Sequence, residues 1–276
     1  MIAKLARVTL SRTLYSSLKD LKSTNDNIRF GRLLIVRVSN GEVSVDTTNY
    51  TVIFAVLSYA GRALMILTKK QVGEILDACL LSHGNENWRR KRANDHHHWR
   101  AWINPRALCS CSDGELKQNF LEYVKAGAGR HRFVSFQLHA LVADMPRLRI
   151  VLQALLDQKT PLVDRINAVL QSTGRHYTYG FGRALATSIL MDSDPREYLT
   201  WNNATEIGLS LLGSWPLFQS SDSPGQKYAA VLKESKSIRS CRPQLTMLEL
   251  DFLFWSAVND PLTRAVITHK MASHLE

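Results

Sequence analysis

The chain has 276 residues, of which 45% are hydrophobic and 21% are charged, and its formal net charge is +11. This is an ordinary globular composition, which excludes a chain too polar to bury a core and allows one large or two smaller domains. The charge will attract polyanions, of which nucleic acid is the commonest, although a basic surface can also serve solubility alone.

The N-terminal part gives three further constraints. Residues 1–22 read as a basic helix, a pattern that transit peptides share. The most apolar run, residues 51–68, is short for a membrane span and contains Arg62, so we expect a buried segment and no membrane association. Four cysteines in a chain of this length do not form a disulfide framework, which indicates a reducing, intracellular compartment.

The first third of the chain is predicted to contain β-structure followed by a helix. Residues 33–68 carry β-branched runs around Asn40-Gly41, a dipeptide typical of a hairpin turn. Residues 69–81 return to the helical spacing of apolar residues.

The rest of the chain is predicted to be mainly helical. Helical patterns cover residues 115–156 and 245–258, whereas residues 214–242 read as loop. The fold class is therefore mostly α, and α+β overall. We expect a mixed α/β region over residues 1–139 and an all-α domain over residues 140–276.

Two glycines stand on either side of Phe181, directly before a predicted apolar helix. Gly180 and Gly182 would allow a sharp bend and a close approach of the backbone to a ligand. The amides of Gly182, Arg183 and Ala184 would then lie at the start of the helix, where unpaired N–H groups and the helix dipole favour an anion. Arg183 adds a formal charge. We therefore expect a DNA phosphate at Gly180, Gly182, Arg183 and Ala184.

The stretch from about residue 160 to 213 resembles the helix-hairpin-helix segment of the DNA glycosylase family. The matching residues are Gly180-Phe181-Gly182-Arg183, the apolar Ala186, Ile189 and Leu190, Trp201-Asn202 and Leu212-Gly213. The resemblance implies a helix-hairpin-helix domain that grips phosphate. The family's lysine nucleophile falls on Ala184 and its aspartate on Asn202, which argues against base-excision chemistry.

This resemblance implies a DNA-binding protein without catalytic residues, metal or cofactor. By resemblance alone, its setting would be bacterial genome defence or DNA repair, in the cytoplasm or at the nucleoid. The purely structural alternative is that Gly182 permits tight helix packing and Trp201 belongs to the core.

A second candidate DNA contact is the basic segment 87–106, which reads as a loop. Its cations can bind phosphates and its tryptophans can stack on exposed bases. Alternatively, the tryptophans anchor a solvated loop to the core. The candidate residues are Trp88, Arg89, Arg90, Lys91, Arg92, Trp99, Arg100 and Trp102.

Two other functions remain open. The run His96–His98 lies close in sequence to Cys109 and Cys111, which are possible zinc ligands. The string Asp95-His96-His97, followed by Asn104 and Cys109, also faintly resembles an HNH nuclease. The Cys-x-x-Cys pairs and the trailing histidine expected of such a site are missing, so we expect no metal there. A nuclease or a divergent glycosylase is nonetheless the enzyme alternative. A subunit that docks on a protein partner around Phe252–Trp255 is the other.

Overall fold

The computed structural model describes residues 35–39, 42–46, 67–82, 86–127 and 135–273. Contacts divide the chain into two units, Met1–Ala60 and Gly61–Glu276, and each is described by itself. The helix expected over residues 1–22 and most of the β-rich segment 33–68 lie outside the described residues.

In the first unit the structure describes two antiparallel strands, β1 (Ile35–Ser39) and β2 (Glu42–Asp46). Their register pairs Val36 with Val45 and Ser39 with Glu42.

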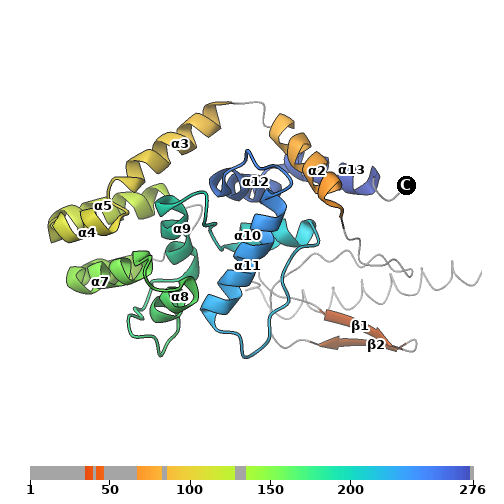
Figure 1. The fold of residues 1–276 in the computed structure, drawn as a ribbon. Coiled ribbons are helices and arrows are strands. Elements are labelled where there is room, and N and C mark those ends of the chain that lie inside the picture. The colour runs from red at the N-terminus through yellow and green to blue at the C-terminus, as the bar shows by residue number, and fades with distance from the viewer. Residues whose placement is uncertain (1–34, 40–41, 47–66, 83–85, 128–134, 274–276) are drawn as a thin grey trace, which may run out of the picture. The chain divides into compact units, whose positions relative to one another are not determined.

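The described part of the second unit is an all-α fold (Figure 1). Its helices are α2 (Lys69–Ser82), α3 (Glu86–Arg100), α4 (Pro105–Ser110), α5 (Asp113–Ala126), α6 (Ser135–Ala143), α7 (Met145–Leu156), α8 (Leu162–Leu170), α9 (Arg183–Ser193), α10 (Asn203–Leu211), α11 (Pro224–Arg239), α12 (Met247–Asn259) and α13 (Pro261–Ser273). The helices expected over 69–81 and 245–258 are thereby confirmed as α2 and α12, within two residues at each end.

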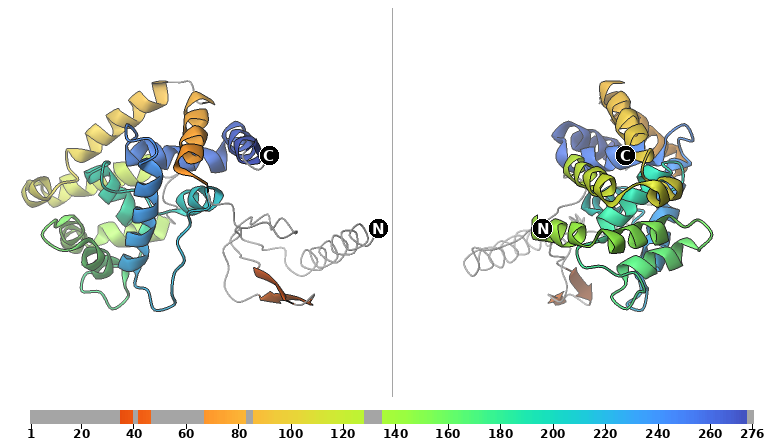
Figure 2. Two further views of the ribbon diagram at one scale, coloured as in Figure 1. Left: turned by 45° about the vertical axis from the view of Figure 1, so that its right-hand side comes forward. Right: turned by 90° about the vertical axis from the view of Figure 1, so that its left-hand side faces the viewer.

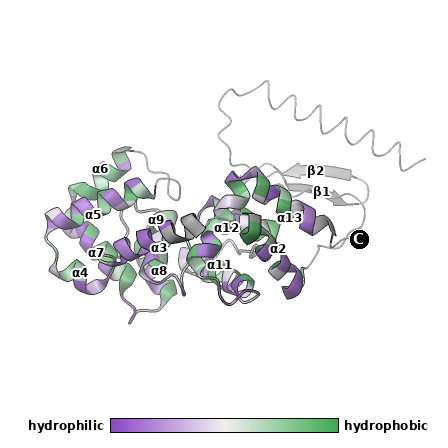
Figure 3. Ribbon diagram, turned by 90° about the horizontal axis from the view of Figure 1, so that it is seen from above, coloured by the Kyte–Doolittle hydropathy of each residue, from purple (hydrophilic) through white to green (hydrophobic). Residues whose placement is uncertain are grey.

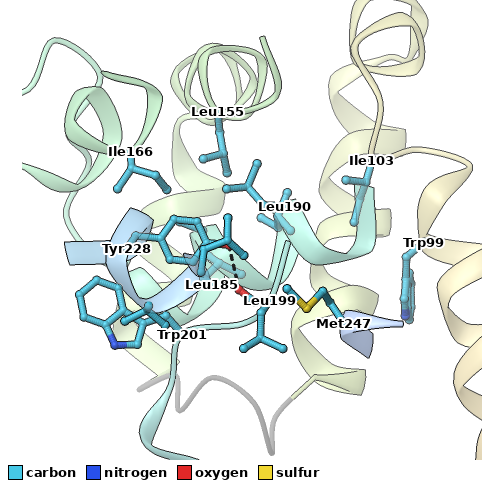
Figure 4. Packing of buried hydrophobic residues seen from close by; sticks show 14 of the residues in the cluster. Trp99, Ile103, Leu155, Ile166, Leu185, Leu190, Leu199, Trp201, Tyr228 and Met247 are labelled. Carbon is cyan, nitrogen blue, oxygen red and sulfur yellow. Dashed lines mark hydrogen bonds between the residues drawn. The ribbon is translucent and has the colours of Figure 1, made fainter. Parts of the chain in front are cut away.

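Helix α9 is in contact with α3, α7, α8 and α12 (Figure 2). Almost every residue of α9 from Leu185 to Asp192 is buried. Figure 4 shows Leu185 and Leu190 of this helix packed near Leu155 and Ile166. The start of α9, where the anion site is predicted, is therefore held by a rigid core.

The hydrophobic core does not divide near residue 140. One cluster of buried side chains runs from Val72 to Ile267 and includes residues on both sides of the expected boundary. Residue 139 itself lies inside α6, and the contacts divide the chain between Ala60 and Gly61 instead.

Two segments that read as loops are helices. Residues 86–100 form α3, and among the side chains of this helix that the structure describes Trp99 alone is buried, so the apolar periodicity is weak. Residues 224–239 form α11, which begins with a capping box between Ser223 and Gln226. Its buried face follows helical spacing, and its members are Tyr228, Val231, Leu232, Ser235 and Ile238.

Hydrophilic and hydrophobic residues alternate along these helices (Figure 3), as expected of helices that each turn one face to a common core. Within the described residues, none of the helices is both long and apolar enough to cross a lipid bilayer.

Candidate nucleic-acid interface

The loop between α8 and α9 is held in place by Arg147 of α7. The Arg147 guanidinium donates hydrogen bonds to the Thr178 hydroxyl at 3.3 Å and to the Tyr177 carbonyl at 3.0 Å. A third bond runs to the Arg175 carbonyl at 3.3 Å. The His176 amide also donates to the Ala168 carbonyl, at 2.8 Å. The loop that leads into the two glycines is therefore fixed by α7 and α8.

The two glycines have different roles. Gly180 has a φ of 87°, in the left-handed region, and a Cβ there would lie 3.2 Å from the Gln137 carbonyl oxygen. Gly182 has a φ of −83°, which any residue adopts, and a Cβ there would meet nothing within 4 Å. Gly180 is needed for the bend, whereas Gly182 leaves open space in front of α9. The alternative that Gly182 permits tight helix packing is wrong, because no atom of the described residues lies within 4 Å of the position that its Cβ would take.

The first turn of α9 has backbone amides without a hydrogen-bond acceptor among the described residues, although fewer than the three that the sequence predicts. The Gly182 amide donates to the Gly180 carbonyl at 3.0 Å, so it is already engaged. The Arg183 and Ala184 amides find no acceptor within the part of the chain that the structure describes. Gly182, the N-cap residue, has no side chain to cap them. Two of the three predicted donors therefore remain available to a ligand.

The Arg183 side chain is oriented by two neighbours. Its guanidinium lies 4.7 Å from the centre of the Trp201 ring and forms an ion pair of 2.5 Å with Glu206. The Trp201 indole N–H donates to the same carboxylate at 3.2 Å. The Arg183 side chain is still 47% exposed. An anion at the start of α9 would therefore share this guanidinium with Glu206.

All four predicted phosphate-binding residues line one cavity of about 580 Å³. The sequence did not mark out the other residues of its wall as binding residues, and these are Gln137, Leu170, Tyr177, Thr178, Tyr179, Phe181, Leu185, Trp201, Pro224 and Lys227. Tyr179 is 59% exposed and stacks on Phe136, whose ring centre is 6.4 Å away. The run Tyr-Thr-Tyr before the first glycine was the available signal, because binding residues lie disproportionately on loops that a rigid scaffold positions.

The loop beside this cavity has a positive environment. Burial lowers the pKa of His176, and the charges of Arg175 and Arg147 lower it further. The lowered pKa keeps the imidazole neutral at physiological pH. This end of the molecule favours an anionic ligand.

The basic segment 87–106 supplies a helix face rather than a loop. Trp99 and Trp102 are buried and meet Tyr123 edge-on, with ring centres 5.3 and 5.8 Å away. For these two tryptophans, anchoring to the core is the role that the structure supports, because their rings are covered. Lys91 and Arg100 are exposed. The side chains of Trp88, Arg89, Arg90 and Arg92 lie outside the described part.

The histidine run and the two nearby cysteines have separate partners. His96 Nδ1 lies 3.8 Å from the buried Asp192 carboxylate. The Cys109 sulfur accepts a hydrogen bond from Gln153 at 3.4 Å, and Cys111 lies 3.3 Å from the Arg149 guanidinium. Among the residues that the structure describes, no three histidine, cysteine or acidic side chains gather as a metal site would require.

Comparisons with protein-family models, with curated proteins and with solved structures found no match. The likeness of residues 160–213 to the DNA glycosylase family is thus carried by the quoted motif alone. The function of the chain has to be inferred from its own residues.

Proposed function

We propose that this protein binds DNA and that the bend before α9, with the first turn of that helix, holds a backbone phosphate. The observation that carries the proposal is the meeting of Gly180, Gly182, Arg183 and Ala184 in one cavity. Two amides in this cavity, those of Arg183 and Ala184, have no acceptor among the described residues. Unpaired amides at the positive end of a helix dipole are a favourable site for a phosphate.

The surroundings favour a nucleic acid over a simple anion. Lys227 lines the same cavity, and Arg183 is half-exposed beside it. Tyr177 and Tyr179 are 39% and 59% exposed, which leaves aromatic faces on which a base can stack. The net charge of +11 adds long-range attraction to a polyanion.

The proposed activity is binding without base excision. Ala184 occupies the position that corresponds to the family's lysine and offers no amine. Asn202 occupies the position of its aspartate, and its side chain accepts a hydrogen bond from the Thr205 amide as the N-cap of α10. Genome defence and DNA repair in bacteria are the settings that the resemblance favours.

Of the other functions, one rests on a specific observation. Trp255 of α12 is 39% exposed and stacks on Phe252, with ring centres 5.9 Å apart. This pair would suit a protein partner, and such docking is compatible with DNA binding at α9. The nuclease alternative has no comparable support from the described histidines.

The proposal is tested by fluorescence anisotropy with a labelled short duplex over a series of salt concentrations. The logarithm of the affinity should fall linearly with the logarithm of the salt concentration, because each phosphate contact releases counterions. Lys227→Gln should reduce this slope by about 0.9, the value for one phosphate contact. Lys233→Gln is the matched control, since Lys233 is exposed on the same helix but does not line the cavity.

Undetectable affinity at low salt, or an affinity that is independent of salt, would contradict DNA binding. Equal slopes for the two lysine variants would instead place the contact elsewhere on the surface.

A further inference from the structure

A second cavity, of about 270 Å³, lies where the ends of α3, α7 and α9 meet. It shares no wall residue with the cavity at the start of α9. Its wall is mostly polar and contains two arginines. The residues that line it are Arg100, Ile103, Asn104, Pro105, Leu156, Gln158, Arg165, Ser193 and Tyr198.

Arg165 of α8 is buried in this wall, with only 5% of its surface exposed. Its guanidinium donates to the Leu155 carbonyl at 3.0 Å and to the Tyr198 hydroxyl at 3.0 Å. The Nε atom is buried and has no acceptor among the described residues. Because the Tyr198 oxygen accepts from Arg165, the phenolic proton remains available to donate.

No carboxylate forms an ion pair with Arg165 within the described ranges. The charge of Arg165 does affect the pKa of one acid, Asp157. Hydrogen bonds from the Thr160 hydroxyl and the Lys159 amide lower the pKa of Asp157 first, and the charge of Arg165 contributes last. A guanidinium that is removed from water without an ion-pair partner is costly, and an oxyanion beside it would offset that cost.

The second arginine, Arg100, indicates a ligand rather than a purely structural role. Arg165 could stabilise the end of α7 through the Leu155 carbonyl alone. That function would not require another cation in the same wall, yet Arg100 of α3 lines the cavity and is exposed to solvent. The cavity is thus surrounded by two guanidiniums and a phenolic hydroxyl. These are hydrogen-bond donors of the kind that bind phosphate groups.

We propose that this cavity binds a phosphate group, held by the buried Arg165 and the exposed Arg100, with the Tyr198 hydroxyl as a further donor. The site is independent of the proposed DNA contact at α9. The phosphate can belong to a free phosphate monoester or to a nucleic-acid backbone, since both present the same oxygens.

The test is the unfolding temperature of the full chain as inorganic phosphate replaces chloride at constant ionic strength. A ligand that binds the folded state raises this temperature in step with the logarithm of its concentration. Phosphate should raise the unfolding temperature of the wild type. Arg100→Gln, which changes an exposed side chain, should weaken phosphate affinity by about tenfold or more, the loss expected of a charge-assisted hydrogen bond.

Further variants separate this site from general effects of charge and folding. Arg165→Met keeps a long buried side chain and should abolish the rise in unfolding temperature that phosphate causes. If Arg165→Met does not fold, Tyr198→Phe takes its place and should reduce this rise. Lys233→Gln, which removes one charge from an exposed residue that lines neither cavity, should leave the shift unchanged. The proposal is overturned if phosphate gives no shift in the wild type, if Arg100→Gln retains the full shift, or if Lys233→Gln loses as much of the shift as Arg100→Gln.

The two phosphate sources are distinguished by phosphorus NMR of the wild type with bound phosphate. Release of phosphate on addition of a duplex would assign the site to a nucleic-acid backbone. Retention of phosphate would assign it to a free monoester. Both results require that phosphate binds at Arg165 and Arg100.

Discussion

At the scale of single residues, the two glycines have different functions. One sets the shape of the bend, and the other leaves the backbone amides accessible to a ligand. Gly180 occupies the left-handed region next to the Gln137 carbonyl, so it sets the bend. Gly182 adopts an extended conformation that any residue could take, yet its missing side chain exposes the amides of Arg183 and Ala184. The sequence could predict that a bend and a helix start lie here. The sequence could not predict which glycine sets the bend and which exposes the amides, because that depends on the atoms around the position that a Cβ would take at each.

His176 provides a measurement of the charge environment at this bend. Burial, then Arg175 and Arg147, hold its pKa below the ordinary value of 6.5. A bound DNA phosphate would offset the two arginine charges, so we expect the pKa of His176 to rise when a duplex is added. The change is measured by NMR titration of the imidazole protons with and without duplex.

His269 of α13 serves as the control, because it lies outside the α8–α9 loop and its signals should not respond to the duplex. A fall in the pKa of His176 on binding, or no change at saturating duplex, would contradict a phosphate at this loop.

At the scale of elements, α9 is tied to α5 by a buried polar contact as well as by apolar packing. The Tyr123 hydroxyl lies 2.7 Å from the Asp192 carboxylate and 2.9 Å from the Ser188 hydroxyl. All three residues are buried. A hydrogen bond to a buried charged group contributes more than one between neutral groups, so this contact should position the helix that carries the proposed site.

Tyr123→Phe removes this contact and should lower the free energy of unfolding by about 1.5–3 kcal/mol. Tyr228→Phe is the matched comparison, because the buried Tyr228 hydroxyl donates to the neutral Leu199 carbonyl at 2.8 Å (Figure 4). That variant should lose only about 1 kcal/mol. Urea unfolding measures both. An equal loss in the two variants would show that the Asp192 carboxyl group contributes no more than a neutral acceptor.

The helices also show what local patterns could and could not predict. Helix α2 was predictable because Val72, Ile75 and Leu76 share one buried face. Helix α11 had the same kind of periodicity, but the Ser-Pro-Gly at its start reads as a turn until Ser223 is recognised as an N-cap. Among the described side chains of α3, Trp99 alone is buried, and its contact with Tyr123 of α5 joins segments too far apart in the sequence for a local pattern to predict.

At the scale of the whole molecule, the composition predicted the excess of positive charge. It could not predict where in the fold the positive side chains would lie. Lys227 and Arg147 lie 44 and 36 residues from Arg183, yet Lys227 lines the same cavity and Arg147 braces the loop beside it. The same holds for the core around residue 140. Apolar runs on both sides of residue 140 pack into one core, and a local sequence pattern does not predict such long-range packing.

The central claim is that the open space in front of α9 admits a DNA phosphate, and duplex affinity of Gly182→Asp tests it most directly. A carboxylate at this N-cap position should preserve or slightly raise the unfolding temperature, because aspartate caps helices better than glycine. It would also occupy the phosphate position. Gly114→Asp is the control, since it adds the same charge in the first turn of α5, where a Cβ has its nearest neighbour at 3.9 Å.

We expect both variants to remain folded, Gly182→Asp to bind a duplex about tenfold or more weakly than the wild type, and Gly114→Asp to bind nearly as well as the wild type. A folded Gly182→Asp protein that binds DNA as tightly as the wild type, or an equal loss in Gly114→Asp, would contradict the proposed site.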